Sequence, residues 1–111
     1  MAFSKVCTLD DLWKGEMEAF EIDGTDVLLL HTDSGDIHAV QAVCPHQEVD
    51  LAEGELEGQV LTCCMHLWQF DVVTGQGVNP THAELAKYPV KVEGEDIWVD
   101  VAGIEVKFAH A

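Results

Sequence analysis

The chain has 111 residues and a hydrophobic fraction of 48%, enough for one domain with one modest core. Its 21 Asp and Glu residues face only five Lys and no Arg, which gives a formal net charge of −16. This excess of acid excludes nucleic acid as a partner and disfavours anionic membrane surfaces, because both are bound through Lys and Arg.

The ends and apolar runs of the sequence bear on its compartment. Residues 1–6 lack the charged and then apolar layout of a signal peptide, and the longest strongly apolar run, residues 27–30, is far too short to cross a membrane. We therefore expect a cytoplasmic protein with reduced cysteines. Its acidity would keep the free chain soluble and monomeric, and would also steer it onto basic patches of partner proteins.

Short segments rich in β-branched and aromatic residues, separated by turn residues, predict strands along the whole chain. Thr8 can cap one helical turn over residues 9–13, with Asp10 and Asp11 near its positive end. No long helical period is present, which excludes a parallel βαβ arrangement. The fold class is therefore all-β, a small antiparallel sandwich or barrel formed by a single domain over residues 1–111. In chain order, strands are expected over residues 3–7, 16–22, 27–32, 37–43, 60–63, 68–71, 90–93 and 97–101.

Two short motifs carry the chemistry. Cys44-Pro45-His46 is followed by Cys63-Cys64-Met65-His66, so each motif supplies one thiolate and one imidazole. Zinc also binds two cysteines and two histidines, but its usual spacing pairs like ligands, whereas here each motif mixes them. A Rieske-type [2Fe–2S] cluster has two cysteines on one iron and two histidines on the other. The spacing favours that cluster, and hence one-electron transfer, with structural zinc as the alternative.

Other residues near the motifs are candidate neighbours of the cluster or of a docked partner. Pro45 stiffens the first loop, and Gln47 borders it. Trp68 either shields the cluster or simply packs in the core. Asn79-Pro80 is expected to begin a third loop against the cluster, with Gly75 and Gly77 permitting a close approach.

The remaining cysteines and histidines are not spaced as metal ligands, and the remaining tryptophans are expected to have structural roles. Cys7 and Cys64 are expected to be small buried hydrophobes, with a disulfide or redox role as the alternative. Trp13 and Trp98 are expected in the core. Surface or half-buried positions are expected for His31, His38, His82 and His110.

The chain resembles the Rieske ferredoxins essentially from end to end, in residues 8–13, 15–18, 41–48 and 66–68 above all. It is most similar to the ferredoxin component of multicomponent toluene and alkene monooxygenases. The resemblance implies three antiparallel sheets with a cluster-bearing tip, in a cluster-binding subdomain of about residues 43–82. It also implies that Cys44 and Cys63 hold the inner iron of one [2Fe–2S] cluster, and that His46 and His66 bind the outer iron.

The resemblance further implies a function. An NADH-dependent flavin and iron–sulfur reductase would load the ferredoxin, which would pass single electrons to a diiron hydroxylase through transient, electrostatically assisted complexes. The protein would not be an enzyme in isolation, because Rieske oxygenases need a further domain with a mononuclear iron site. Two alternatives stay open at this point: the ferredoxin of an aromatic ring-hydroxylating dioxygenase, and a zinc-stabilised interaction module.

Overall fold

A computed structural model describes residues 3–22, 24–44, 50–63, 68–79 and 83–104 of the chain. Within these ranges the structure is built from antiparallel strands and two short 3-10 turns, η1 (Leu9–Asp11) and η2 (Leu51–Glu53), which confirms the all-β prediction. The strands are β1 (Ser4–Thr8), β2 (Met17–Ile22), β3 (Thr25–His31), β4 (Ile37–Gln41), β5 (Glu55–Glu57), β6 (Val60–Thr62), β7 (Gln69–Asp71), β8 (Gly77–Asn79), β9 (Lys87–Tyr88), β10 (Val90–Glu93) and β11 (Asp96–Val99).

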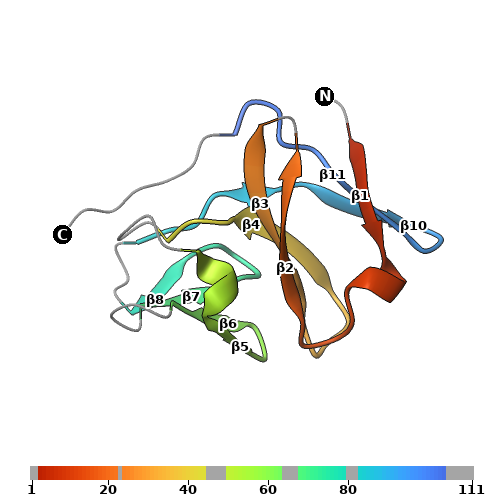
Figure 1. The fold of residues 1–111 in the computed structure, drawn as a ribbon. Coiled ribbons are helices and arrows are strands. Elements are labelled where there is room, and N and C mark those ends of the chain that lie inside the picture. The colour runs from red at the N-terminus through yellow and green to blue at the C-terminus, as the bar shows by residue number, and fades with distance from the viewer. Residues whose placement is uncertain (1–2, 23, 45–49, 64–67, 80–82, 105–111) are drawn as a thin grey trace.

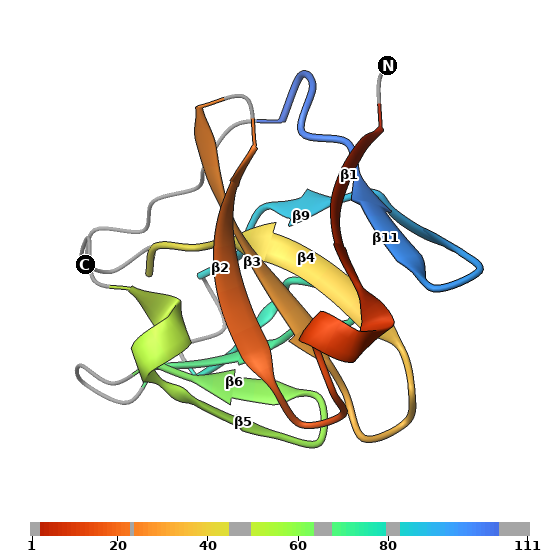
Figure 2. The same cartoon turned by 45° about the vertical axis from the view of Figure 1, so that its right-hand side comes forward.

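Three antiparallel sheets make up the fold, as the resemblance implied (Figure 1). Their strand orders are β1-β11-β10, β2-β3-β4-β9 and β5-β6-β7-β8. In Figure 2 the β2–β4 sheet lies between β1 and β11 on one side and β5 and β6 on the other. All eight predicted strands are present, although the one expected over residues 37–43 already ends at Gln41. Three very short strands, β5, β8 and β9, were not predicted.

Strand β3 lies between two hydrophobic cores and contributes side chains to both. Its four residues from Val27 to Leu30 are fully buried, because alternate side chains of a strand point to opposite faces and both faces are covered. Val27 and Leu29 face what we call the base core, and Leu28 and Leu30 face what we call the cysteine core. The base core comprises Cys7, Leu12, Ile22, Val27, Leu29, Ala39, Ala86, Tyr88, Ile97 and Val99. The cysteine core comprises Leu28, Leu30, Val40, Ala42, Cys44, Leu51, Leu61, Cys63, Phe70, Val72, Ala83 and Leu85.

The turn after Thr8 forms as predicted, but only over three residues. The carboxylate of Asp11 accepts a hydrogen bond from the Thr8 backbone N–H at 3.0 Å, which fixes the start of η1. The turn buries Leu12, whereas Trp13 is 67% exposed, so the expectation that Trp13 is a core residue is wrong. The indole N–H of Trp13 donates instead to the Asp10 carbonyl at 3.0 Å, on the outside of the turn.

Trp98 occupies an intermediate position. It is half-buried and lies on the face of β11 opposite to Ile97 and Val99, which point into the base core. The ammonium of Lys91 lies 5.5 Å from the centre of its ring, within the range of a cation–π contact.

None of the helical segments in the described part of the chain could span a bilayer.

Candidate metal centre

The first cysteine motif starts where two backbone segments, residues 42–43 and 50–51, pair with each other. We call this pairing the first root. After β4 the chain turns away from its sheet and folds back, so that Val43 forms a bridge with Asp50 and the Leu51 N–H donates to the Ala42 carbonyl at 2.8 Å. Cys44 is the first residue past this root, and it is fully buried. The backbone therefore places the Cys44 thiol in the protein interior. Three predicted site residues, Pro45, His46 and Gln47, lie outside the described residues.

The second motif also begins at a pair of backbone segments, the end of the hairpin formed by β6 and β7. We call the pairing of Cys63 with Trp68 the second root. Strands β6 and β7 pair from Val60 and Asp71 to Thr62 and Gln69, and the Cys63 N–H then donates to the Trp68 carbonyl at 2.7 Å. Cys63 is also fully buried. The predicted ligand His66 lies outside the described residues, as does Cys64.

Cys44 and Cys63 meet in one environment, the cysteine core. Both cysteines are fully buried and belong to one cluster with Leu28, Leu51 and Phe70. Cys44 and Cys63 are the two predicted ligands that lie among the described residues, within which no group of three His, Cys, Asp or Glu side chains is placed to hold a metal ion. Two fully buried cysteines in an apolar core fit the sulfur side of an iron–sulfur cluster.

Trp68 lies at the edge of this core. It is half-buried, packs against the cysteine core, and has its ring centroid 6.5 Å from that of Phe70 at an interplanar angle of 48°. Its carbonyl also closes the second root by accepting from Cys63. Of the two roles expected for Trp68, packing is therefore present in the structure.

A third segment contributes Ala83 and Leu85 to the same core. The Leu85 N–H donates to the Gly75 carbonyl at 2.7 Å, and the Gly77 N–H donates to the Ala83 carbonyl at 2.8 Å. A Cβ added to Gly75, which has φ +81°, would lie 2.7 Å from the Leu85 carbonyl oxygen, so this position accepts only glycine without a shift of the backbone. The approach of this loop to the cluster stays a prediction. Pro80, the predicted start of this loop, lies outside the described residues.

Cys7 belongs to the base core and not to the cysteine core. Burial, together with the negative charges of Asp11 and Glu18, raises the pKa of its thiol to about 11. Such a thiol stays protonated at neutral pH and is a poor nucleophile. This agrees with the expectation that Cys7 is a small buried hydrophobe.

Two described histidines are half-buried, as expected. His31 Nδ1 lies 2.9 Å from the Leu12 carbonyl, and His38 Nδ1 lies 3.1 Å from the ammonium of Lys87. Lys87 also donates to the Val73 carbonyl at 2.6 Å, so its side chain ties β9 to the turn between β7 and β8. Sequence reasoning gave this pair no role, since two residues 49 positions apart carry no local signal.

Gln41 is a second residue that sequence reasoning missed. It is fully buried, and its side-chain amide bonds to the backbone of Val43 and Ala86, beside the first root. A signal was present, because Gln41 is the one polar residue within the apolar run 39–44. A buried amide must find partners, which marks such a position for inspection.

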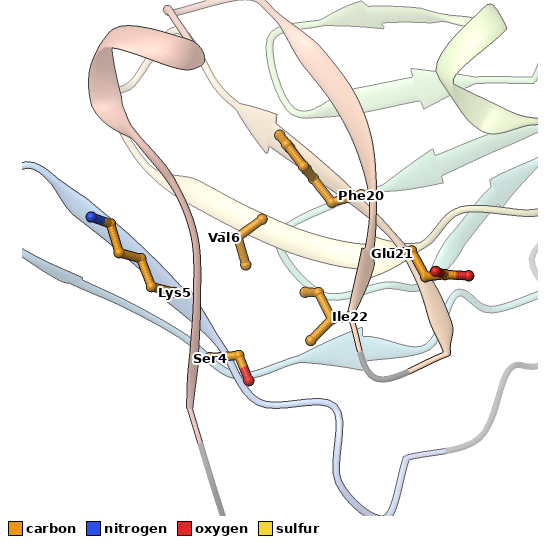
Figure 3. A pocket seen from close by; sticks show the side chains of 6 residues that line it. All are labelled: Ser4, Lys5, Val6, Phe20, Glu21 and Ile22. Atoms are coloured by element: carbon orange, nitrogen blue, oxygen red, sulfur yellow. The ribbon is translucent and has the colours of Figure 1, made fainter.

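A surface groove of about 260 Å³ lies elsewhere, between β1 and β2 (Figure 3). Among the described residues its lining comes from these two strands, and none of those residues belongs to the cysteine core. The ammonium of Lys5, one of the lining residues, lies 3.3 Å from the carboxylate of Asp96. The groove is therefore not part of the candidate metal centre. Its lining residues are Ser4, Lys5, Val6, Phe20, Glu21 and Ile22.

Comparison with known proteins places the chain in a family. Residues 2–89 match the Rieske [2Fe-2S] domain. The chain is 50% identical over 90 residues to the ferredoxin component of the alkene monooxygenase system of Xanthobacter autotrophicus, covering 80% of this chain and 73% of that protein. It is 38% identical over 104 residues to the ferredoxin component of biphenyl 2,3-dioxygenase from Rhodococcus jostii, covering 93% and 96%.

Solved structures agree with this placement. The ferredoxin of carbazole 1,9a-dioxygenase from Nocardioides aromaticivorans IC177 has a TM-score of 0.81 and 31% identity, covering 89% of this chain and 97% of that one. A ferredoxin in complex with the oxygenase of carbazole 1,9a-dioxygenase has a TM-score of 0.83 and 26% identity, covering 96% and 97%. The chain therefore belongs to the Rieske [2Fe–2S] domain family, as an electron-carrying ferredoxin and not an enzyme, with one Rieske-type cluster as its cofactor.

Proposed function

We propose that this ferredoxin carries single electrons from an NADH-dependent flavin and iron–sulfur reductase to the diiron hydroxylase of an alkene or aromatic monooxygenase. The observation that carries the proposal is the 50% identity to a ferredoxin component of an alkene monooxygenase system, against 38% and 37% for two biphenyl dioxygenase ferredoxins. The second candidate, service to an aromatic ring-hydroxylating dioxygenase, is favoured by the fuller coverage of those ferredoxins.

Within this function, Cys44 and Cys63 would hold the inner iron and His46 and His66 the outer iron, in a cluster-binding subdomain of about residues 43–82. The support is the burial of both thiols beside closed roots in the cysteine core. The bound cluster supplies a one-electron redox couple. The chain's part is to orient the two thiolates and to exclude water from their side of the cluster. Pro45, Gln47, Trp68 and Pro80 would border the cluster or a docked partner.

Charge would guide the encounters. Of the described lysines, Lys5 and Lys91 lie 3.3 and 3.6 Å from Asp96 and Glu93, and Lys87 is turned inward onto Val73 and His38. The net charge of −16 already includes these lysines, so the acidic side chains far outnumber the cationic ones. Basic patches on the reductase and hydroxylase would therefore attract the carrier into short-lived complexes, without tight binding. The free carrier would be a cytoplasmic monomer.

The ligand set is tested by substitution and metal analysis. Cys44→Ser and Cys63→Ser should abolish the visible absorbance and the rhombic EPR signal of the reduced cluster, because each removes one of only two thiolates. Cys7→Ser is the matched control, and should retain one [2Fe–2S] cluster per chain. His46→Cys or His66→Cys should lower the reduction potential or lose the cluster. Zinc in place of iron and acid-labile sulfide would favour the interaction module and contradict the proposal.

The partner is tested by reconstitution. The reduced ferredoxin is mixed with the diiron hydroxylase of an alkene monooxygenase or with the oxygenase of a biphenyl dioxygenase, and the rate of product formation is measured. We expect substantially faster turnover with the diiron hydroxylase. Faster turnover with the dioxygenase would instead support the second candidate.

Steering is tested by salt. We expect the second-order rate constant for reduction of the ferredoxin by its reductase to fall as NaCl rises from about 0.01 to 0.5 M, because the Debye length shrinks from about 30 Å to a few Å. A rate constant that does not change with salt would show that the acidic surface does not guide the encounter.

A further inference from the structure

Gln41 is a buried polar side chain in an apolar setting. It is the last residue of β4, it is fully buried, and the next buried residues along the chain are Ala42 and Cys44. Burying an amide costs free energy unless its hydrogen bonds are made. The partners of Gln41 therefore indicate what this residue does.

The side chain of Gln41 takes over a bond that main-chain pairing would otherwise make. Strands β4 and β9 pair at Ala39 with Tyr88 and at Val40 with Lys87, so that Gln41 and Ala86 are the next pair. The Gln41 N–H donates to the Ala86 carbonyl at 3.0 Å, as in a regular ladder. The Ala86 N–H, however, donates to Gln41 Oε1 at 2.8 Å.

The other end of the same amide reaches the first cysteine root. Gln41 Nε2 donates to the Val43 carbonyl at 2.8 Å. That carbonyl belongs to the peptide group that contains the Cys44 nitrogen, and a peptide group is planar. Holding the carbonyl therefore fixes the plane from which the Cys44 side chain departs. The bridge between Val43 and Asp50 holds the same residue from the other strand of the root.

Through Ala86, Gln41 also reaches the third segment near the cysteine core. Residues 83–86 lead into β9, and they are tied to the β7–β8 region by the bonds from Leu85 to Gly75 and from Gly77 to Ala83. One buried amide thus spans two segments that are separate in sequence, the root of the first motif and the approach to β9.

We propose that Gln41 is a positioning residue for the iron–sulfur cluster, which locks the Cys44 root to residues 83–86 and so fixes the direction of the Cys44 thiolate. The inference rests on the proposed role of Cys44 as a ligand. It assigns Gln41 no contact with the cluster. Its effect is transmitted through the Val43–Cys44 peptide group.

The test compares holoproteins that differ at this amide. Gln41→Met keeps the length of the side chain and removes the hydrogen bonds to Val43 and Ala86, whereas Gln41→Asn keeps an amide that is one methylene too short to reach these two residues together. The matched control is Thr32→Val, because Thr32 is also buried and its hydroxyl bonds to Ser34 and Asp36, at the far end of β3. Cluster loss is followed by bleaching of the visible absorbance under an iron chelator.

We expect Gln41→Met to lose its cluster at least about tenfold faster than wild type, the usual scale for an outer-shell partner of a metal ligand. Its reduced-state EPR signal should be broadened, and the Ala86 and Leu51 amides should exchange faster with deuterium. Gln41→Asn should fall between Gln41→Met and wild type, and Thr32→Val should match wild type in cluster loss and EPR.

Two outcomes separate the possible failures. If Gln41→Met and Gln41→Asn lose the cluster no faster than Thr32→Val and show the wild-type EPR signal, Gln41 is only a buried structural amide and the inference is overturned. If Gln41→Met does not fold, the rates of Gln41→Asn and Thr32→Val decide in the same way. Retention of a normal cluster by Cys44→Ser would instead overturn the proposed ligand set on which the inference depends.

Discussion

The two cores on either side of β3 are built differently. Around the base core, β1 to β4 have five to seven residues, β10 and β11 have four, and the short β9 has two. The other sheet, β5 to β8, has only three residues in each strand. The cysteine core beneath it includes the thiols of Cys44 and Cys63.

This difference indicates which part of the fold stands on its own. Short strands contribute little independent stability and need a packed face or a further tie. In the β5–β8 sheet the tie would be the cluster, since binding a metal group to ligands that folding brings together adds directly to the free energy of folding. We expect the base core to fold without the cluster, and the β5–β8 sheet to depend on it.

Removing the cluster should produce the largest difference between the two regions. In the apoprotein, we expect the amides of Leu61 and Phe70 to lose most of their protection from hydrogen exchange, because their sheet loses its central tie. The amides of Val27 and Leu29 should keep theirs. Hydrogen exchange of apoprotein and holoprotein, measured residue by residue, checks this. Equal loss of protection in both regions would mean that the cluster stabilises one cooperative unit.

Two adjacent leucines on β3 allow the two cores to be compared by substitution, with a smaller expected effect. Leu28→Ala and Leu29→Ala each remove a fully buried leucine, and each should lower the free energy of unfolding by about 2–5 kcal/mol. Leu28 faces the cysteine core and Leu29 faces the base core. Only Leu28→Ala should therefore also speed cluster loss.

The two leucine variants are each other's control, since they share residue type, strand and burial. Urea unfolding gives the stability of each variant, and bleaching under a chelator gives the rate of cluster loss. Equal rates of cluster loss at matched stability would show that the cluster senses global stability and not the packing of its own core.

The two regions were also unequally predictable from sequence. The long strands around the base core carry clear signals, such as the continuous apolar run 27–30, and they lie where they were predicted. The short strands β5 and β8 read ELE and GVN, with no apolar period of their own. They are strands because hairpin partners β6 and β7 supply their hydrogen bonds, so tertiary context decides their state.

The candidate site divides in the same way. Cys44 and Cys63 could be chosen from motif spacing, because the chemistry of the cluster dictates residue types and order. Gln41 could be noticed as the one polar residue of an apolar run, but its partner Ala86 is distant in sequence. Lys87 could not be chosen, because its role depends on a contact with Val73, which is also distant in sequence. Trp13 was misplaced because large aromatic residues are usually buried, whereas here η1 turns Leu12 inward instead.

The smallest effect concerns the junction of the two regions, where Lys87 joins His38 of β4 to the Val73 carbonyl. Burial, and then the positive charge of Lys87, lower the pKa of His38, while Asp36 and Asp71 partly oppose this shift. Because Nδ1 accepts from an ammonium, the imidazole is neutral in this arrangement. Protonation of His38 would therefore release Lys87 from one of its two partners.

The sign of the pH dependence follows from that direction. With a folded-state pKa below the ordinary 6.5, the unfolded chain binds more protons at mildly acidic pH, so His38 destabilises the fold as the pH falls below 6.5. His38→Asn keeps an acceptor for Lys87 but does not titrate. Between pH 7.5 and 5.5 it should lose less stability than wild type in urea unfolding, by less than about 1 kcal/mol because solvent screens a half-buried group. Identical pH profiles of stability for the two proteins would mean that protonation of His38 does not weaken the link that Lys87 makes between β4 and the β7–β8 turn.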